Sequence, residues 1–94
     1  MEHCDERLSY LNRLADELGN GQFVVRLVGA ATRPCLRVAN HEVPQLSERV
    51  LCHRAADGSW CFWWPWGQPI GSADDVQAVA TKVMTVLRPV EGAR

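Results

Sequence analysis

Cysteine and histidine are the residues of this 94-residue sequence best suited to metal or covalent chemistry. Five of them could lie close together if two predicted strands pair: Cys35, His41, Cys52, His53 and Cys61. Structural zinc sites usually hold pairs of ligands at close spacing, and the sequence has no Cys-x-x-Cys or His-x-x-x-His pair. We therefore expect no metal site, and we interpret the cysteines, Cys4 included, as reduced residues that pack like small apolar ones.

Catalytic chemistry has few candidates. Cys52 or Cys61 with His41 could form a nucleophile and base, but such a pair needs hydrogen-bond contact and a third, orienting group. Asp74-Asp75 resembles a pair of catalytic carboxylates, yet at a helix start such residues serve as capping and dipole partners. The sequence has no phosphate-binding glycine loop and no nucleophile elbow. It predicts a protein that is not an enzyme, with no catalytic residues and no cofactor.

Five arginines lie on or beside the predicted strands: Arg26, Arg33, Arg37, Arg49 and Arg54. The whole chain carries a formal net charge of −1, which provides no field for a phosphate backbone or an anionic membrane. We interpret these arginines as a solvated or edge-protecting set, although exposed rings beside them could stack on single-stranded nucleic acid. The prediction is that neither nucleic acid nor a membrane is a partner.

The aromatic residues are unevenly distributed, because five of them fall in one short run: Trp60, Phe62, Trp63, Trp64 and Trp66. On a regular strand, Trp60, Phe62 and Trp64 share one face, while Cys61 and Trp63 occupy the other. Trp66 joins the first set only if the strand continues past a proline, which lacks the N–H for pairing. Three such rings cover on the order of 500–700 Å², as much as the largest apolar patch on a typical monomer.

This aromatic run has three interpretations. It can be the core of a small domain, which then needs no disulfide or metal for stability. It can be a surface that contacts another protein, because tryptophan is a favoured interface residue. It can also line a pocket for a small molecule or a peptide, including a proline-rich one.

Hydrophobic periodicity places these residues on a short series of elements. The expected elements are a helix at about 5–18, strands at about 22–28, 35–39, 48–54 and 59–64, and a helix at about 73–88. We expect Asp5 and Ser72 to cap the helices, Gly19 to end the first one, and Gly58 to close a hairpin turn. Short connections favour an antiparallel meander. The sequence thus predicts one α+β domain over 1–94, a two-layer sandwich of order αββββα with four strands.

The strands carry more apolar surface than this arrangement can cover. Phe23, Val25 and Leu27 share one face of the first strand, yet Val24 and Val28 make its other face apolar too. Each helix has a single apolar stripe, so the two helices can cover only one face. The leading hypothesis is a non-catalytic protein–protein interaction module that dimerises or docks on a different protein through the Trp-rich sheet face.

In this hypothesis the contact residues are Trp60, Phe62, Trp63, Trp64 and Trp66, with Trp64 and Trp66 as anchors and the others divided between core and surface. The partner is a second copy, which gives a homodimer, or a heterologous protein. The alternative is a small-molecule or peptide binding domain with a Trp-lined pocket.

The start of the chain is acidic and no stretch reaches the roughly 18 apolar residues of a membrane span, so we expect a cytoplasmic protein. The run from Trp60 to Val76, Trp-Cys-Phe-Trp-Trp-Pro-Trp-Gly-Gln-Pro-Ile-Gly-Ser-Ala-Asp-Asp-Val, resembles small uncharacterised proteins of actinomycetes. Those proteins share a Trp-rich strand, a Trp-Gly-x-Pro-Ile turn and a capped final helix. The resemblance implies a cytosolic accessory or regulatory protein and assigns no site residues.

Overall fold

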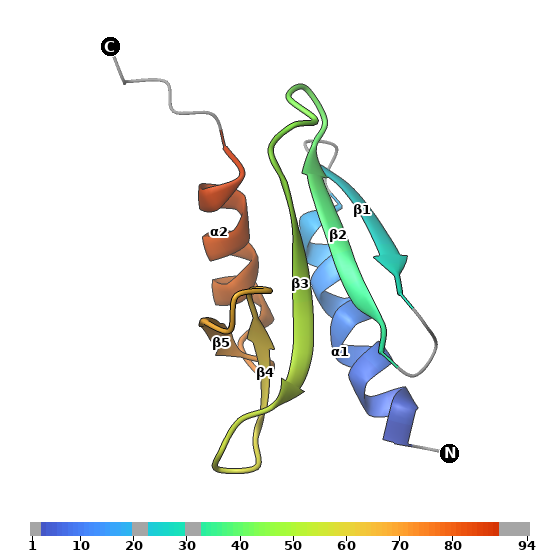
Figure 1. Cartoon of the computed structure of the whole chain (residues 1–94), viewed down its shortest axis with the longest axis vertical. Helices are drawn as coiled ribbons and strands as arrows, with labels where there is room; N and C mark the ends of the chain where they lie inside the picture. The colour runs from blue at the N-terminus through green and yellow to red at the C-terminus, as the bar shows by residue number, and fades with distance from the viewer. Residues whose placement is uncertain (1–2, 20–22, 30–32, 89–94) are drawn as a thin grey trace.

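The computed structural model describes residues 3–19, 23–29 and 33–88. Along the chain, one helix precedes a run of five strands and a second helix follows it (Figure 1). In order, the elements are α1 (His3–Leu18), β1 (Phe23–Val28), β2 (Cys35–Asn40), β3 (Ser47–Arg54), β4 (Trp60–Trp63), β5 (Pro69–Ser72) and α2 (Val76–Val86). The boundaries of α1 and of the first four strands lie within one or two residues of the predicted ones.

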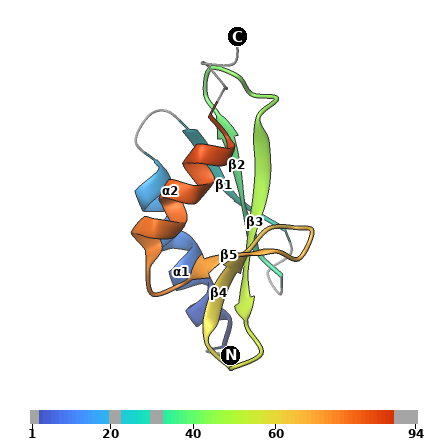
Figure 2. The ribbon, with the colours of Figure 1, turned by 90° about the vertical axis from the view of Figure 1, so that its left-hand side faces the viewer.

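All five strands pair antiparallel with their neighbours in chain order, from β1 to β5. Both helices lie on one side of the sheet, so the fold has two layers and one face of the sheet has no helix over it (Figure 2). We call the face under the helices the covered face and the opposite one the open face. The predicted α+β class and antiparallel meander are confirmed, and the predicted strand number, four, is corrected to five.

The strand that the sequence did not predict, β5, follows a tight turn after Trp64. Trp64 N–H donates to the Gln68 carbonyl at 2.9 Å, and Gly67 N–H donates to the Trp64 carbonyl at 2.9 Å. Gly67 has a φ of +93°, which glycine adopts without strain. Pro65 is therefore the second residue of a hairpin turn, a position at which proline is favoured. After the turn the chain returns as a paired strand and not as a loop.

The start of α2 also differs from the prediction. Ser72 is the last residue of β5, and its hydroxyl accepts from the Asp74 N–H at 3.2 Å, within the turn before the helix. Asp75 is the actual N-cap, since its carboxylate accepts from the Ala78 N–H at 3.4 Å. At the other end of the chain α1 already begins at His3, ahead of the predicted cap. Gly19 follows the end of α1 as predicted.

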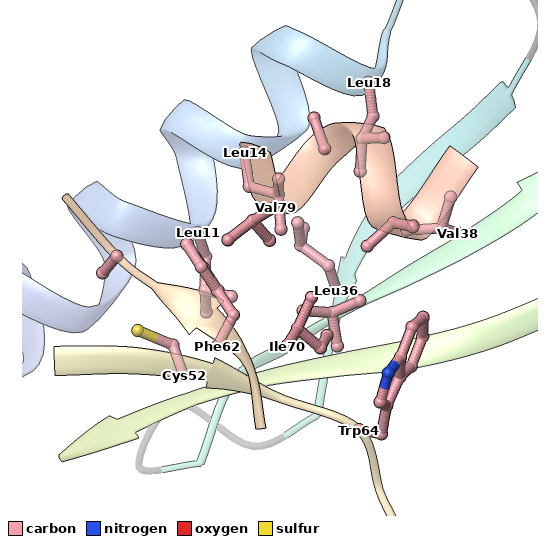
Figure 3. Packing of buried hydrophobic residues seen from close by; sticks show 14 of the residues in the cluster. Leu11, Leu14, Leu18, Leu36, Val38, Cys52, Phe62, Trp64, Ile70 and Val79 are labelled. Atoms are coloured by element: carbon pink, nitrogen blue, oxygen red, sulfur yellow. The ribbon is translucent and has the colours of Figure 1, made fainter. Parts of the chain in front are cut away.

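The core lies between the covered face and the helices (Figure 3). Leucines of α1, valines of α2 and alternate strand residues fill it, among them Leu11, Leu14, Leu36, Val38, Val50, Phe62, Val79 and Val83. Along β3, Val50 and Cys52 are buried whereas Leu51 between them is only half-buried, as alternation on a strand requires. The strands therefore present every second residue to the open face.

Asn40, at the end of β2, is the one buried polar residue of the described chain. Its side-chain N–H donates to the Leu87 carbonyl at 3.0 Å, at the end of α2. Its side-chain oxygen accepts from the N–H groups of Glu42 and Val43 at 2.9 and 3.0 Å. These bonds satisfy the buried amide and hold the β2–β3 connection against α2.

Candidate interaction surface

The predicted contact residues on the covered face belong to the core. Phe62 has no exposed surface and Trp64 is 7% exposed, so neither ring is available to a partner while the domain is folded (Figure 3). Trp60 is half-buried at the edge of the core, with its ring centroid 5.9 Å from that of Tyr10. The Trp60 ring also lies 5.2 Å from the Arg54 guanidinium. This alternation fits the predicted facing of Trp60, Phe62 and Trp64, and it removes Phe62 and Trp64 from the set of contact residues.

Trp66 lies in the β4–β5 turn and is 59% exposed. Its ring stacks on that of Trp64, with centroids 5.3 Å apart and planes 7° from parallel. Its indole N–H donates to the Gln68 side-chain oxygen at 3.2 Å. Trp64 thus acts as a support that fixes an exposed indole, instead of the anchor that the sequence predicted.

Trp63 points away from the helices, onto the open face. Its indole N–H donates to the His53 carbonyl at 3.1 Å, and its ring stacks on the His53 imidazole with centroids 4.6 Å apart. Leu51 and Cys61, both half-buried, lie at neighbouring positions of the same face. This end of the open face is therefore apolar and aromatic, and its rings are held in place by contacts within the chain.

The metal and nucleophile candidates considered from the sequence are divided between the two faces of the sheet. Cys52 pairs with Phe62 and His53 pairs with Cys61, so Cys52 and Cys61 lie on opposite faces of the sheet. Within residues 3–19, 23–29 and 33–88, no three His, Cys, Asp or Glu side chains are grouped as metal ligands. The candidate ligands that the sequence offers are thus not gathered into such a group among these residues.

The Cys52 thiol is also unsuited to act as a nucleophile. Burial raises the pKa of Cys52 to about 12, which leaves the thiol protonated at neutral pH. His41 follows β2 at the end of the sheet where β3 begins, since Asn40 N–H donates to the Leu46 carbonyl there. Cys52 is five residues beyond Ser47, where β3 begins, which is a distance of roughly 16 Å along the strand. His41 is therefore too far from the Cys52 thiol to act as its base.

Three of the strand arginines form a row across the open face. Arg26 pairs with Arg37, and Arg37 pairs with Arg49, so the three residues sit side by side on β1, β2 and β3. All three are exposed, and the guanidinium groups of these three residues have no hydrogen bond or ion pair to another described residue. We call these three residues the arginine row. It places three positive charges together in a chain whose net charge is −1.

Apolar residues border the arginine row on both sides. Two-residue steps along the strands lead to Val24 and Ala39, with the small polar Ser47, on one side, and to Val28, Cys35 and Leu51 on the other. A hollow of about 230 Å³ is lined by Val24, Ala39 and two arginines of the row. On the other side of the row, a groove of about 410 Å³ reaches from the open face around the end of β2 to α1. It is lined by Arg33, Pro34, Cys35, Arg49, Leu51, His53 and Pro65, and by Arg7 of α1 and Cys52 of the covered face. The groove has no tryptophan in its lining, so it is not the Trp-lined pocket of the alternative hypothesis.

The sequence places the three arginines on predicted strands, but it does not show that they form a row. Arg26, Arg37 and Arg49 are 11 and 12 residues apart, and no local motif joins them. Their alternation with apolar neighbours predicts which face each one occupies, but only the strand register puts them side by side. The register depends on the turn geometry of the β1–β2 and β2–β3 connections, which the alternation pattern does not determine.

No protein family, curated protein or solved structure matches this chain. Of the helices in the described ranges, none is long and apolar enough to span a membrane.

Proposed function

We propose that this protein is a non-catalytic protein–protein interaction module, with an accessory or regulatory role, that docks a partner through the open face of its sheet. The observation that carries the proposal is the placement of both helices on the other face. The open face keeps Val24 at 41% exposure and half-buried Leu51 and Trp63 beside the arginine row. Contiguous apolar groups bordered by charge are typical of surfaces that another protein covers.

This proposal revises which residues of the aromatic run contact the partner. Trp63 contributes from the open face, and Trp66 contributes from the β4–β5 turn, which projects to the side away from the helices (Figure 2). Trp60, Phe62 and Trp64 instead hold this part of the sheet against the helices. Because both outer rings are already stacked on a neighbour, little side-chain entropy is lost when they are covered.

Charge favours a heterologous partner over a second copy. A symmetric dimer uses the same patch on both chains. If it buried the whole open face, two arginine rows would lie in one interface, where like charges oppose association. A different protein with acidic groups has no such conflict.

Site-specific photocrosslinking in the native cells tests this function. A benzophenone amino acid replaces Val24 on the open face, and the matched control replaces Val86 of α2, which is similarly apolar and 50% exposed. We expect adducts with another protein from position 24 and not from position 86. Equal adducts from both positions, or none from position 24, would contradict docking on the open face. An adduct with twice the mass of the 10.5 kDa chain would replace the heterologous partner with a second copy.

A further inference from the structure

The arginine row is an unusual feature for the surface of a sheet. Like charges directly opposite each other on neighbouring strands destabilise the pair, and here Arg37 faces an arginine on either side. The strand positions that share the open face with the row contain no Asp or Glu. Glu48 of β3 lies on the covered face, and its carboxylate accepts from the Arg49 backbone N–H at 3.3 Å. No carboxylate on the open face of these strands therefore neutralises the row, which leaves that role to an external group.

The spacing of the row suits one type of acidic ligand. Paired residues of antiparallel strands have Cα atoms about 4.5–5.5 Å apart, so Arg26 and Arg49 are about 10 Å apart. Acidic residues at positions i, i+4 and i+7 of an α-helix share one face and span about 10.5 Å. Acidic residues on one face of an extended strand, at i, i+2 and i+4, span about 13 Å instead. The helical spacing is the closer fit.

The borders of the row define the rest of the ligand. The hollow at Val24 and Ala39 and the groove at Leu51 and Pro65 lie on opposite sides of the arginines. A helix above the row can place apolar side chains in the hollow and in the groove, while its acidic residues pair with the guanidinium groups. Carboxylates and guanidinium groups form the strongest ion pairs in proteins, with two parallel hydrogen bonds.

We infer that the arginine row binds an acidic amphipathic helix of a partner protein, which crosses β1, β2 and β3 with its carboxylates on Arg26, Arg37 and Arg49. This inference rests on the proposed function, because it names the kind of segment that docks on the open face. A nucleic acid is the less suitable occupant, because the chain as a whole has a net charge of −1.

Binding of synthetic peptides tests the inference. The probe is a fluorescent, end-capped 18-residue helix with Glu at i, i+4 and i+7 and Leu on both sides of this stripe, measured by fluorescence anisotropy. One control peptide has Lys in place of Glu, and a second has the same composition with Glu at i, i+2 and i+4. We expect the probe to bind at least about tenfold more tightly than either control.

Two charge-reversal variants locate the contact. Arg37→Glu removes the centre of the row, and Arg88→Glu makes the same change of charge at the exposed end of α2. We expect Arg37→Glu to weaken probe binding at least about tenfold and Arg88→Glu to change it less than about twofold. Binding that is insensitive to Arg37→Glu, or that does not depend on the Glu spacing, would overturn the inference. So would an oligothymidine that binds more tightly than the probe, because it would assign the row to nucleic acid.

The outcome of the peptide experiment is separable from that of the photocrosslinking. If position 24 captures a protein through a segment without acidic residues, the open face remains the docking surface and the acidic helix is excluded. If the probe binds at Arg37 but position 24 captures nothing in cells, the row binds acidic helices in isolation and the proposed function fails.

Discussion

The two faces of the sheet are built from the same strands, yet they follow opposite rules. On the covered face Leu36, Val38 and Val50 are no more than 1% exposed, and they pack under the helices. On the open face, one residue away along the same strands, Arg37 and Arg49 are exposed and in line with a third arginine. Packing alone accounts for the first face. It does not account for the second, where like charges in register are expected to lower the stability of the fold. The proposed binding of an acidic helix would account for them.

The aromatic run shows the same division within two consecutive residues. Phe62 has no exposed surface and takes part in the core, whereas Trp63 is half-buried on the open face and stacks on His53. Removing each ring in turn compares the two faces directly.

Phe62→Ala should lower the free energy of unfolding by about 3–5 kcal/mol, because it removes a fully buried ring and leaves a cavity. Trp63→Ala should lower it by only about 1 kcal/mol, since its ring is half-buried and its contacts are one hydrogen bond and one stack. Urea denaturation followed by circular dichroism measures both. A loss for Trp63→Ala as large as that for Phe62→Ala would show that the open face is a second core.

The burial difference between these neighbours was predictable from the sequence, since strand alternation alone separates Trp60, Phe62 and Trp64 from Trp63. The division of the tryptophans between core and surface was left open, because it depends on which face the helices cover. The end of the run is not predicted, because the missing N–H of Pro65 indicates that regular pairing fades there. The hydrogen bonds of Trp64 with Gly67 and Gln68 instead close a hairpin turn around Pro65. This turn adds β5, and Trp66 within it stacks on Trp64.

A second comparison concerns two cysteines on opposite faces, Cys52 and Cys61. Burial raises the pKa of Cys52 to about 12, whereas Cys61 is half-buried on the open face. Two single-cysteine variants, with the other cysteines replaced by Ser, keep either Cys52 or Cys61. At pH 8 the Cys52 thiol should react with Ellman's reagent at least about a hundredfold more slowly than the Cys61 thiol. The rate for Cys52 should still rise steeply above pH 8, because the thiolate fraction grows about tenfold per pH unit while the pH is below the pKa.

The unfolded chain provides the control for this measurement. In 8 M urea, at the same pH, both single-cysteine variants should react at similar rates, because burial no longer raises the pKa of Cys52. The raised pKa also implies that the fold loses stability as the pH rises above the ordinary pKa of a thiol. Comparable rates in the folded state would place Cys52 in contact with solvent and contradict its assignment to the covered face.

The smallest expected effect is the most informative about the open face. Arg37→Thr removes the central charge of the arginine row and introduces a residue with high β-propensity, so it should raise the free energy of unfolding by about 0.5–1 kcal/mol at low salt. At about 1 M salt the Debye length falls to about 3 Å, so the part of the gain that comes from relieved repulsion should disappear. Urea denaturation at the two salt concentrations separates the two contributions. Arg37→Thr should also weaken binding of the acidic helix. Arg37 would then be a residue that binding requires although it lowers the stability of the fold. A loss of stability at low salt would instead show that the arginines support the fold, and the row would then need no ligand to explain it.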